Sequence, residues 1–121
     1  MFGWMRRKLD RPVEMGSSEI EFLGAQTGSD EARLQQAVSK ALAAHAAVRS
    51  AYLARVRYGA TAPENIALCL TGASSDAVLD EVQKLFWAMF DHGAHLDLLF
   101  ITADEEARLV SVCAPFYVAS T

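Results

Sequence analysis

The chain has 121 residues and a net charge of −4, and 52% of its residues are hydrophobic while 21% are charged. A chain of this length and composition is expected to fold as one globular domain, which excludes an intrinsically disordered protein and one with a membrane-spanning apolar segment. The charge is unevenly distributed, because residues 1–18 carry +2 and the remaining residues −6. An acidic body repels phosphate backbones, so we expect no nucleic-acid partner.

The first 18 residues differ in composition from the rest of the chain. They combine apolar side chains with a basic cluster and end in Gly-Ser-Ser at 16–18, which is typical of a flexible joint. We predict a basic, partly flexible N-terminal arm over residues 1–18, followed by a single domain over residues 19–121. The arm could anchor to an acidic membrane surface or a partner groove, or it could lie on its own domain or in solvent. Pro12 interrupts the helical period that an anchor needs.

Hydrophobic periodicity predicts alternating strands and helices along the domain. Alternating residues indicate strands, and apolar residues at three- and four-residue steps indicate amphipathic helices. Ser29 is placed to cap the first helix, with Asp30 and Glu31 in its first turn. In chain order we predict a strand near 19–23, a helix from Ser29 to about His45, strands over 49–58 and 66–71, a helix that opens at 72–76 and ends near Gly93, a strand over 96–101 and a short helix from Asp104.

The order strand, helix, strand, strand, helix, strand is that of the ferredoxin-like split βαβ fold. In this α+β arrangement, two right-handed crossovers place both helices on one face of a four-stranded antiparallel sheet. We predict this βαββαβ fold with a short C-terminal helix added to it. The opposite face of the sheet is then left for something else to cover.

Two short motifs carry a resemblance to a known family. One is Val48-Arg49-Ser50-Ala51-Tyr52-Leu53-Ala54 after an amphipathic helix, and the other is Ala114-Pro115-Phe116-Tyr117 near the end of the chain. With these motifs, residues 19–118 resemble the C-terminal domain of the enhanced-serine-sensitivity protein SseB. The resemblance implies a bacterial, cytoplasmic protein with no established catalytic residues. Members of the family are named for an increased sensitivity to serine when they are overproduced, which implies either a link to amino-acid metabolism or the titration of a protein partner. It also implies a shared structural or interaction role for Ala51, Tyr52, Leu53, Pro115, Phe116 and Tyr117.

A few polar and thiol side chains are candidates for chemistry. His92, His95 and Asp97 could meet around a divalent metal, but they surround an ordinary helix-to-strand turn and are explained as well by solvated turn residues. Cys69 and Cys113 lie in apolar strings, which favours reduced core thiols over nucleophiles and agrees with a cytoplasmic location. We therefore expect no enzymatic activity, no metal and no cofactor.

Two surfaces remain for binding. Trp87 and Phe90 lie outside the core stripe of the second helix, where they could anchor a partner, and Trp87 could equally be covered by the N-terminal arm or the C-terminal segment. The uncovered sheet face would invite pairing with a second copy, unless residues 110–118 fold back over it. The predicted contact surface consists of Tyr52, Leu53, Arg55, Arg57, Trp87, Phe90, Leu99, Ile101, Phe116 and Tyr117.

These surfaces support two functional hypotheses. The first is a non-enzymatic interaction or regulatory module that forms a homodimer and binds an unidentified protein partner. The alternative is a domain that senses a small amino-acid-like ligand and is linked to serine metabolism. This alternative follows by analogy with ferredoxin-like regulatory domains and from the phenotype that the resemblance implies.

Overall fold

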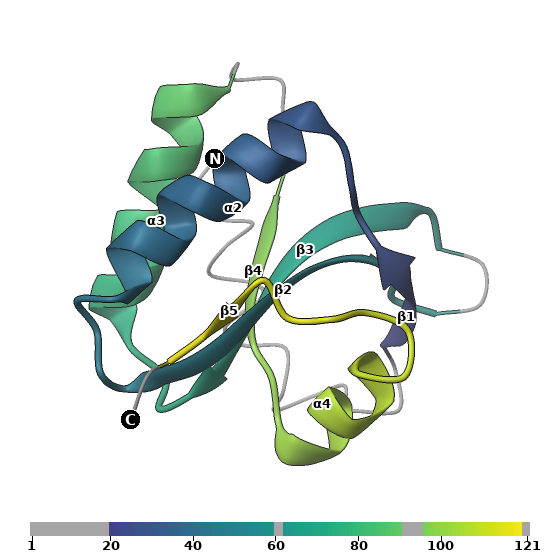
Figure 1. The fold of residues 1–121 in the computed structure, drawn as a ribbon. Helices are drawn as coiled ribbons and strands as arrows, with labels where there is room; N and C mark the ends of the chain where they lie inside the picture. The colour runs from purple at the N-terminus through teal and green to yellow at the C-terminus, as the bar shows by residue number, and fades with distance from the viewer. Residues whose placement is uncertain (1–19, 60–61, 91–95, 120–121) are drawn as a thin grey trace.

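The computed structural model describes residues 20–59, 62–90 and 96–119, and Figure 1 shows how they are arranged. The predicted arm over residues 1–18 lies outside the described residues. The elements are β1 (Glu21–Ala25), α2 (Ser29–Leu42), β2 (Val48–Arg57), β3 (Glu64–Gly72), α3 (Asp76–Met89), β4 (Asp97–Phe100), α4 (Ala103–Leu109) and β5 (Tyr117–Val118). The α+β class and the predicted order of strands and helices are confirmed, with the two-residue strand β5 added at the end.

The strands form one mixed sheet. β1 pairs with β2, and β2 with β3, in antiparallel fashion, whereas β3 and β4 are parallel. The prediction of an all-antiparallel sheet is therefore wrong at β4, because α3 carries the chain back across the sheet and β4 then runs in the direction of β3. The connection through α2 is not a parallel crossover, since it joins the antiparallel neighbours β1 and β2. β1 and β5 share one edge of β2, because β3 occupies the other edge.

Helices α2 and α3 pack side by side on one face of the sheet, as predicted (Figure 1). Each helix buries one apolar stripe, and the two stripes meet the apolar residues of β2, β3 and β4. We call this the helix-side core. Its buried members are Leu34, Val38, Leu42, Val48, Ala51, Leu53, Leu68, Leu70, Val78, Leu79, Val82, Phe86, Leu96 and Leu98.

The opposite face of the sheet is covered within the monomer by α4 and the chain that follows it (Figure 1). Leu109 of α4 and Cys113 beyond it are buried in a second core together with Leu99 and Ile101. The prediction of an open sheet face is therefore wrong. The alternative, in which the C-terminal residues fold back over this face, holds for Cys113. The buried members of this second core are Ile20, Tyr52, Ala54, Val56, Ala67, Cys69, Leu99, Ile101, Leu109 and Cys113.

The register of β2 against β3 shows that the predicted contact surface mixes residues of both sheet faces. Leu53 pairs with Leu68 and belongs to the helix-side core, whereas Tyr52 pairs with Cys69 and lies on the face beneath α4. Placing Leu53 on one contact surface with Tyr52 and Leu99 is therefore wrong. Because β2 is apolar on both faces, the alternation of its side chains does not tell which face meets the helices.

The helix starts are set by local hydrogen bonds, with one exception. Ser75 caps α3 by accepting a hydrogen bond from the Val78 N–H at 3.3 Å. Thr102 and Glu105 form a reciprocal capping box at α4, with distances of 3.1 and 2.8 Å. Helix α2 instead begins after Gly28, whose position has no side-chain cap, and Ser29 lies inside the helix. The predicted cap at Ser29 is therefore wrong.

Candidate functional site

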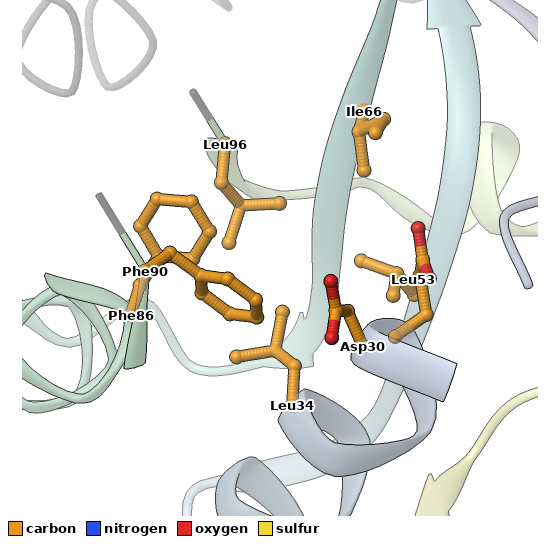
Figure 2. Close-up of a pocket in the computed structure, with 8 residues that line it drawn as sticks. Asp30, Leu34, Leu53, Ile66, Phe86, Phe90 and Leu96 are labelled. Atoms are coloured by element: carbon orange, nitrogen blue, oxygen red, sulfur yellow. The ribbon is translucent and has the colours of Figure 1, made fainter. Parts of the chain in front are cut away.

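A cavity of about 310 Å³ lies between the start of α2, the end of α3 and the sheet (Figure 2). Its volume is at the lower end of the range for small-molecule sites, roughly 300 to 1,000 Å³. Figure 2 shows the rings of Phe86 and Phe90 facing Leu34 across the space. The described residues that line the cavity are Asp30, Glu31, Leu34, Leu53, Ile66, Phe86, Phe90 and Leu96.

The cavity forms because α2 begins with a polar turn. Acidic residues are favoured there, since the free N–H groups of a helix N-terminus attract negative charge. Leu34 is the first buried residue of the helix, so no apolar side chain of the preceding turn covers the sheet below. Farther along, His45 Nε2 lies 2.6 Å from Glu81 Oε1 and joins the end of α2 to α3.

The two polar residues in the described part of the lining are both carboxylates. In Figure 2 the Asp30 carboxylate lies between the side chains of Leu34 and Leu53. Its Oδ1 accepts a hydrogen bond from Arg33 Nη1 at 3.3 Å, and both of these side chains are largely exposed. Glu31 Oε2 accepts a hydrogen bond from the neutral amide of Gln26 at 2.8 Å. The cavity therefore combines an apolar body with one acidic side.

A second, more polar hollow of about 330 Å³ adjoins the cavity at Ile66, which lines both. Arg55 faces Ile66 across the β2–β3 register, and its Nη1 lies 3.6 Å from Glu64 Oε1. Gln26 and Asn65 complete the described lining of this hollow. Its charged side chains Arg55 and Glu64 already pair with each other, and Gln26 is bound to Glu31, so the apolar cavity is the better candidate for a ligand.

Comparison with protein families places most of the chain, including this cavity, in one of them. The family model of the SseB protein C-terminal domain, SseB_C, matches residues 25–118. The chain belongs to the SseB C-terminal domain family. Every residue that lines the cavity lies within the matched range of this SseB C-terminal domain. A search of curated proteins and one of solved structures find no match.

In the part of the SseB C-terminal domain that the structure describes, no helix is long and apolar enough to cross a membrane. The fold and the family do not fix a chemistry, because one fold can host unrelated functions.

A cluster of polar side chains joins α4 to β2 on the sheet face opposite α2 and α3. Tyr52 Oη donates to Glu106 Oε2 at 2.7 Å, Ser50 Oγ reaches the same oxygen at 3.3 Å, and Arg49 Nη2 lies 3.4 Å from Oε1. Burial, followed by the hydrogen bond to Glu106, raises the pKa of Tyr52 to about 12. The phenol therefore stays protonated at neutral pH and acts as a donor to the helix.

Four residues of the predicted contact surface are buried inside the monomer. Tyr52, Leu53, Leu99 and Ile101 are at most 7% exposed, so they form no outer surface of the folded domain. Leu53 has a different place, because it forms part of the floor of the cavity.

The other six residues of the predicted contact surface are partly buried and make contacts within the domain. Of all ten residues of the predicted contact surface, Leu53 and Phe90 line the cavity. Trp87 and Phe116 pack against the helix-side core. The contacts of the others are Arg55 with Glu64, Arg57 Nε and Nη2 with Glu21 Oε1 at 3.1 Å, Phe90 with Phe86 at 5.0 Å between ring centroids, and Tyr117 Oη donating to Leu42 O at 3.3 Å.

The predicted metal candidates are only partly described. His92 and His95 lie outside the described residues, whereas Asp97 is buried at the start of β4. Its Oδ2 accepts a hydrogen bond from Tyr58 Oη at 2.6 Å, which ties the end of β2 to β4. Within the described ranges, no three His, Cys, Asp or Glu side chains gather closely enough to hold a metal ion.

The two cysteines are buried free thiols, as the sequence predicts for Cys69 and Cys113. Burial raises the pKa of the Cys113 thiol, whose Sγ lies 3.6 Å from the carbonyl oxygen of Leu53. A thiol that stays protonated is a poor nucleophile. Both cysteines therefore pack as small apolar side chains in the second core.

Sequence reasoning does not find the cavity, although two local patterns belong to it. Asp30 and Glu31 precede the first buried residue of α2, and Phe86 and Phe90 stand one turn apart near the end of α3. Neither pattern shows that the start of α2 lies beside the end of α3. That juxtaposition, which only the tertiary structure provides, creates the site.

Proposed function

We propose that this SseB C-terminal domain is a non-catalytic regulatory module that binds a small, largely apolar ligand in the cavity between α2, α3 and the sheet. The observation that carries the proposal is the described part of the lining, in which all residues except Asp30 and Glu31 are apolar. A ligand that fills such a site gains about 25 cal/mol for each Å² of apolar surface removed from water. Small-ligand sites commonly have this combination of an apolar wall and a few polar groups.

An amino-acid-like ligand fits this proposal when its side chain is large and apolar. Leucine or phenylalanine would place an aliphatic or aromatic group among Phe86, Phe90 and Leu96. Serine has little apolar surface to bury, so the same lining stabilises it less. We therefore propose a larger apolar molecule, and not serine itself, as the ligand.

We also propose that the domain has no catalytic activity, because two side chains that could act as a base or a nucleophile are buried. Tyr52 and Cys113 are buried, and burial raises the pKa of each. Groups that stay protonated far above neutral pH are poor bases and nucleophiles. The buried free thiols also support a reducing compartment, and we propose the cytoplasm.

Thermal unfolding in the presence of small molecules tests the proposal. The panel contains the twenty amino acids and small aromatic and aliphatic alcohols and amines. A compound present at a hundred times its Kd stabilises the folded state by about 2.7 kcal/mol, which raises Tm by roughly 10 °C for a domain of this size. We expect the larger apolar members to raise Tm and serine to have little effect.

A pair of tryptophan variants shows whether the cavity is the site. Ile66→Trp adds volume at a half-buried position of the lining and is expected to abolish the rise in Tm. Val110→Trp adds a similar side chain at a position that is 52% exposed, outside the lining, and is expected to keep it. No rise with any compound, or an equal rise in Ile66→Trp, would contradict the proposal.

A second proposal is a homodimer formed through strand β5. Val118 is 66% exposed, and among the described strands β5 pairs with β2 alone. A strand edge with an exposed apolar side chain can pair with the same edge of a second copy about a two-fold axis, or with a strand of another protein. We propose this edge as the dimer interface because the sheet face that the sequence suggested for it is covered by α4.

Light scattering during gel filtration tests the homodimer. The wild-type domain is expected to have the mass of a dimer, and Val118→Lys is expected to have the mass of a monomer with unchanged circular dichroism. Val112→Lys is the matched control, because Val112 is 42% exposed but lies outside β5. A monomeric wild-type protein, or a dimer that survives Val118→Lys, argues against this interface.

A further inference from the structure

We infer that the cavity selects an amphipathic cation, meaning a small molecule with an apolar body and a protonated amine, over neutral and anionic molecules of the same shape. The inference rests on the proposed function, because it names the class of ligand for the same cavity. It comes from the charges of the described lining, which are all negative.

Among the residues that the structure describes, the lining contains no basic side chain to offset the two carboxylates. Arg33, which pairs with Asp30, does not line the cavity, and this ion pair is exposed to solvent. The hydrogen-bond partner of Glu31 is the amide of Gln26, which carries no charge. A positive group placed there gains Coulombic attraction, whereas a ligand carboxylate is repelled.

The apolar and acidic sides of the cavity face each other, so one small molecule can reach both. Figure 2 shows Phe86 and Phe90 on the side of α3, and the Asp30 carboxylate on the side of α2. The two rings lie 5.0 Å apart between centroids and are tilted by 38°, a geometry that accepts a further aromatic or aliphatic group. A ligand bound with its apolar group against these rings points its polar end toward α2.

The expected selectivity is modest because two effects weaken the field of the carboxylates. Solvent screens Asp30, which is exposed, and the positive end of the α2 dipole offsets part of the negative charge. Exposed ion pairs of this kind change a binding constant by up to about fivefold each. We therefore expect an amine to bind about fivefold more tightly than the matching alcohol, and an acid to bind more weakly than both.

Isothermal titration calorimetry with three probes of nearly equal shape tests the inference. The probes are phenethylamine, 2-phenylethanol and 3-phenylpropanoate at pH 7, which are positive, neutral and negative. The expected order of affinity is amine, alcohol, acid. Raising the salt concentration is expected to narrow the difference between amine and alcohol, because salt screens exposed charges.

Charge-removing variants assign the selectivity to named residues. Glu31→Gln and Asp30→Asn are each expected to weaken phenethylamine binding about twofold while leaving 2-phenylethanol binding unchanged. Asp80→Asn is the matched control, because Asp80 is an exposed carboxylate of α3 outside the lining. Circular dichroism confirms the fold of each variant, and the three-probe series on the wild-type domain decides the question even if one variant does not fold.

The outcomes separate this inference from the proposed function. Equal affinity for the three probes keeps the cavity as a binding site and overturns only its preference for cations. Phenethylamine binding that neither Glu31→Gln nor Asp30→Asn weakens also overturns it. No binding by these probes or by the wider panel overturns the proposed function itself.

Discussion

Replacing Tyr52 by phenylalanine removes one hydroxyl and changes how stability depends on pH. Tyr52 is 2% exposed, and its hydroxyl donates to Glu106 Oε2 at 2.7 Å. The ring of phenylalanine keeps the packing and loses only the hydrogen bond. A hydrogen bond to a charged group contributes about 1.5 to 3 kcal/mol, so we expect Tyr52→Phe to lower the free energy of unfolding by about that amount at pH 7.

The pH dependence follows from the raised pKa of the phenol. Burial and the hydrogen bond to Glu106 raise the pKa of Tyr52 from 10.0 to about 12 in the folded protein. The stability that this protonated phenol contributes is fully present below pH 10 and is lost as the pH rises from 10 toward 12. At pH 11 the wild-type protein has lost about 1 kcal/mol through Tyr52, whereas the phenylalanine variant has lost nothing through this position.

Urea unfolding at several pH values between 7 and 11 measures the effect. The difference in unfolding free energy between wild type and Tyr52→Phe is expected to narrow by about 1 kcal/mol between pH 9 and pH 11. Other groups that titrate in this range are shared by both proteins and cancel in the difference. Tyr117→Phe is the matched control, because its hydroxyl donates to a backbone carbonyl and not to a carboxylate. A difference for Tyr52→Phe that stays constant with pH would refute the reasoning.

Three further predictions concern the frame that holds the site. Gly72→Ala should destabilise the domain strongly, because φ at Gly72 is +113° and a Cβ there would overlap the Ala47 carbonyl oxygen. Gly59→Ala, at φ +124° and with no described atom within 4 Å of the added Cβ, should cost only the backbone strain of about 1 to 3 kcal/mol. Equal losses of unfolding free energy in urea would contradict this expectation. Thr102→Ala should cost about 1 kcal/mol through loss of the α4 capping box, while Thr27→Ala in an exposed loop should change stability by less than about 0.5 kcal/mol. Cys113 should be alkylated at pH 8 only as fast as the domain opens, since burial raises its pKa, and labelling at the rate of a free thiol would disprove its burial.

Much of the secondary structure can be read from the chain because the signals are local. The alternation in 49–58 and 66–71 and the helical steps that contain Leu34 and Phe86 come from a few consecutive residues. Each matches an element of the structure within a few residues at its ends. The α+β class follows from the order of these elements. The burial of Cys69 and Cys113 is also local information, because both stand in apolar strings.

The tertiary structure decides which strands are neighbours and what covers each face of the sheet. The direction of β4 depends on its pairing with β3, which lies a whole helix earlier in the chain. Leu99 and Ile101 look like surface residues until α4 is placed over them. Their apolar character gives no sign of which neighbour buries them, since apolar attraction has no direction.

The cavity shows the same division between sequence and structure most clearly. The sequence alone determines that the first turn of α2 contains Asp30 and Glu31, because a helix N-terminus favours negative charge. It also determines that Phe86 and Phe90 are four positions apart at the end of α3, where Phe90 directly follows the last helical residue. Only the packing of two helices on one face of the sheet brings the acidic start of one beside the aromatic end of the other. A cavity lined by residues more than 50 positions apart depends on contacts that no local pattern encodes.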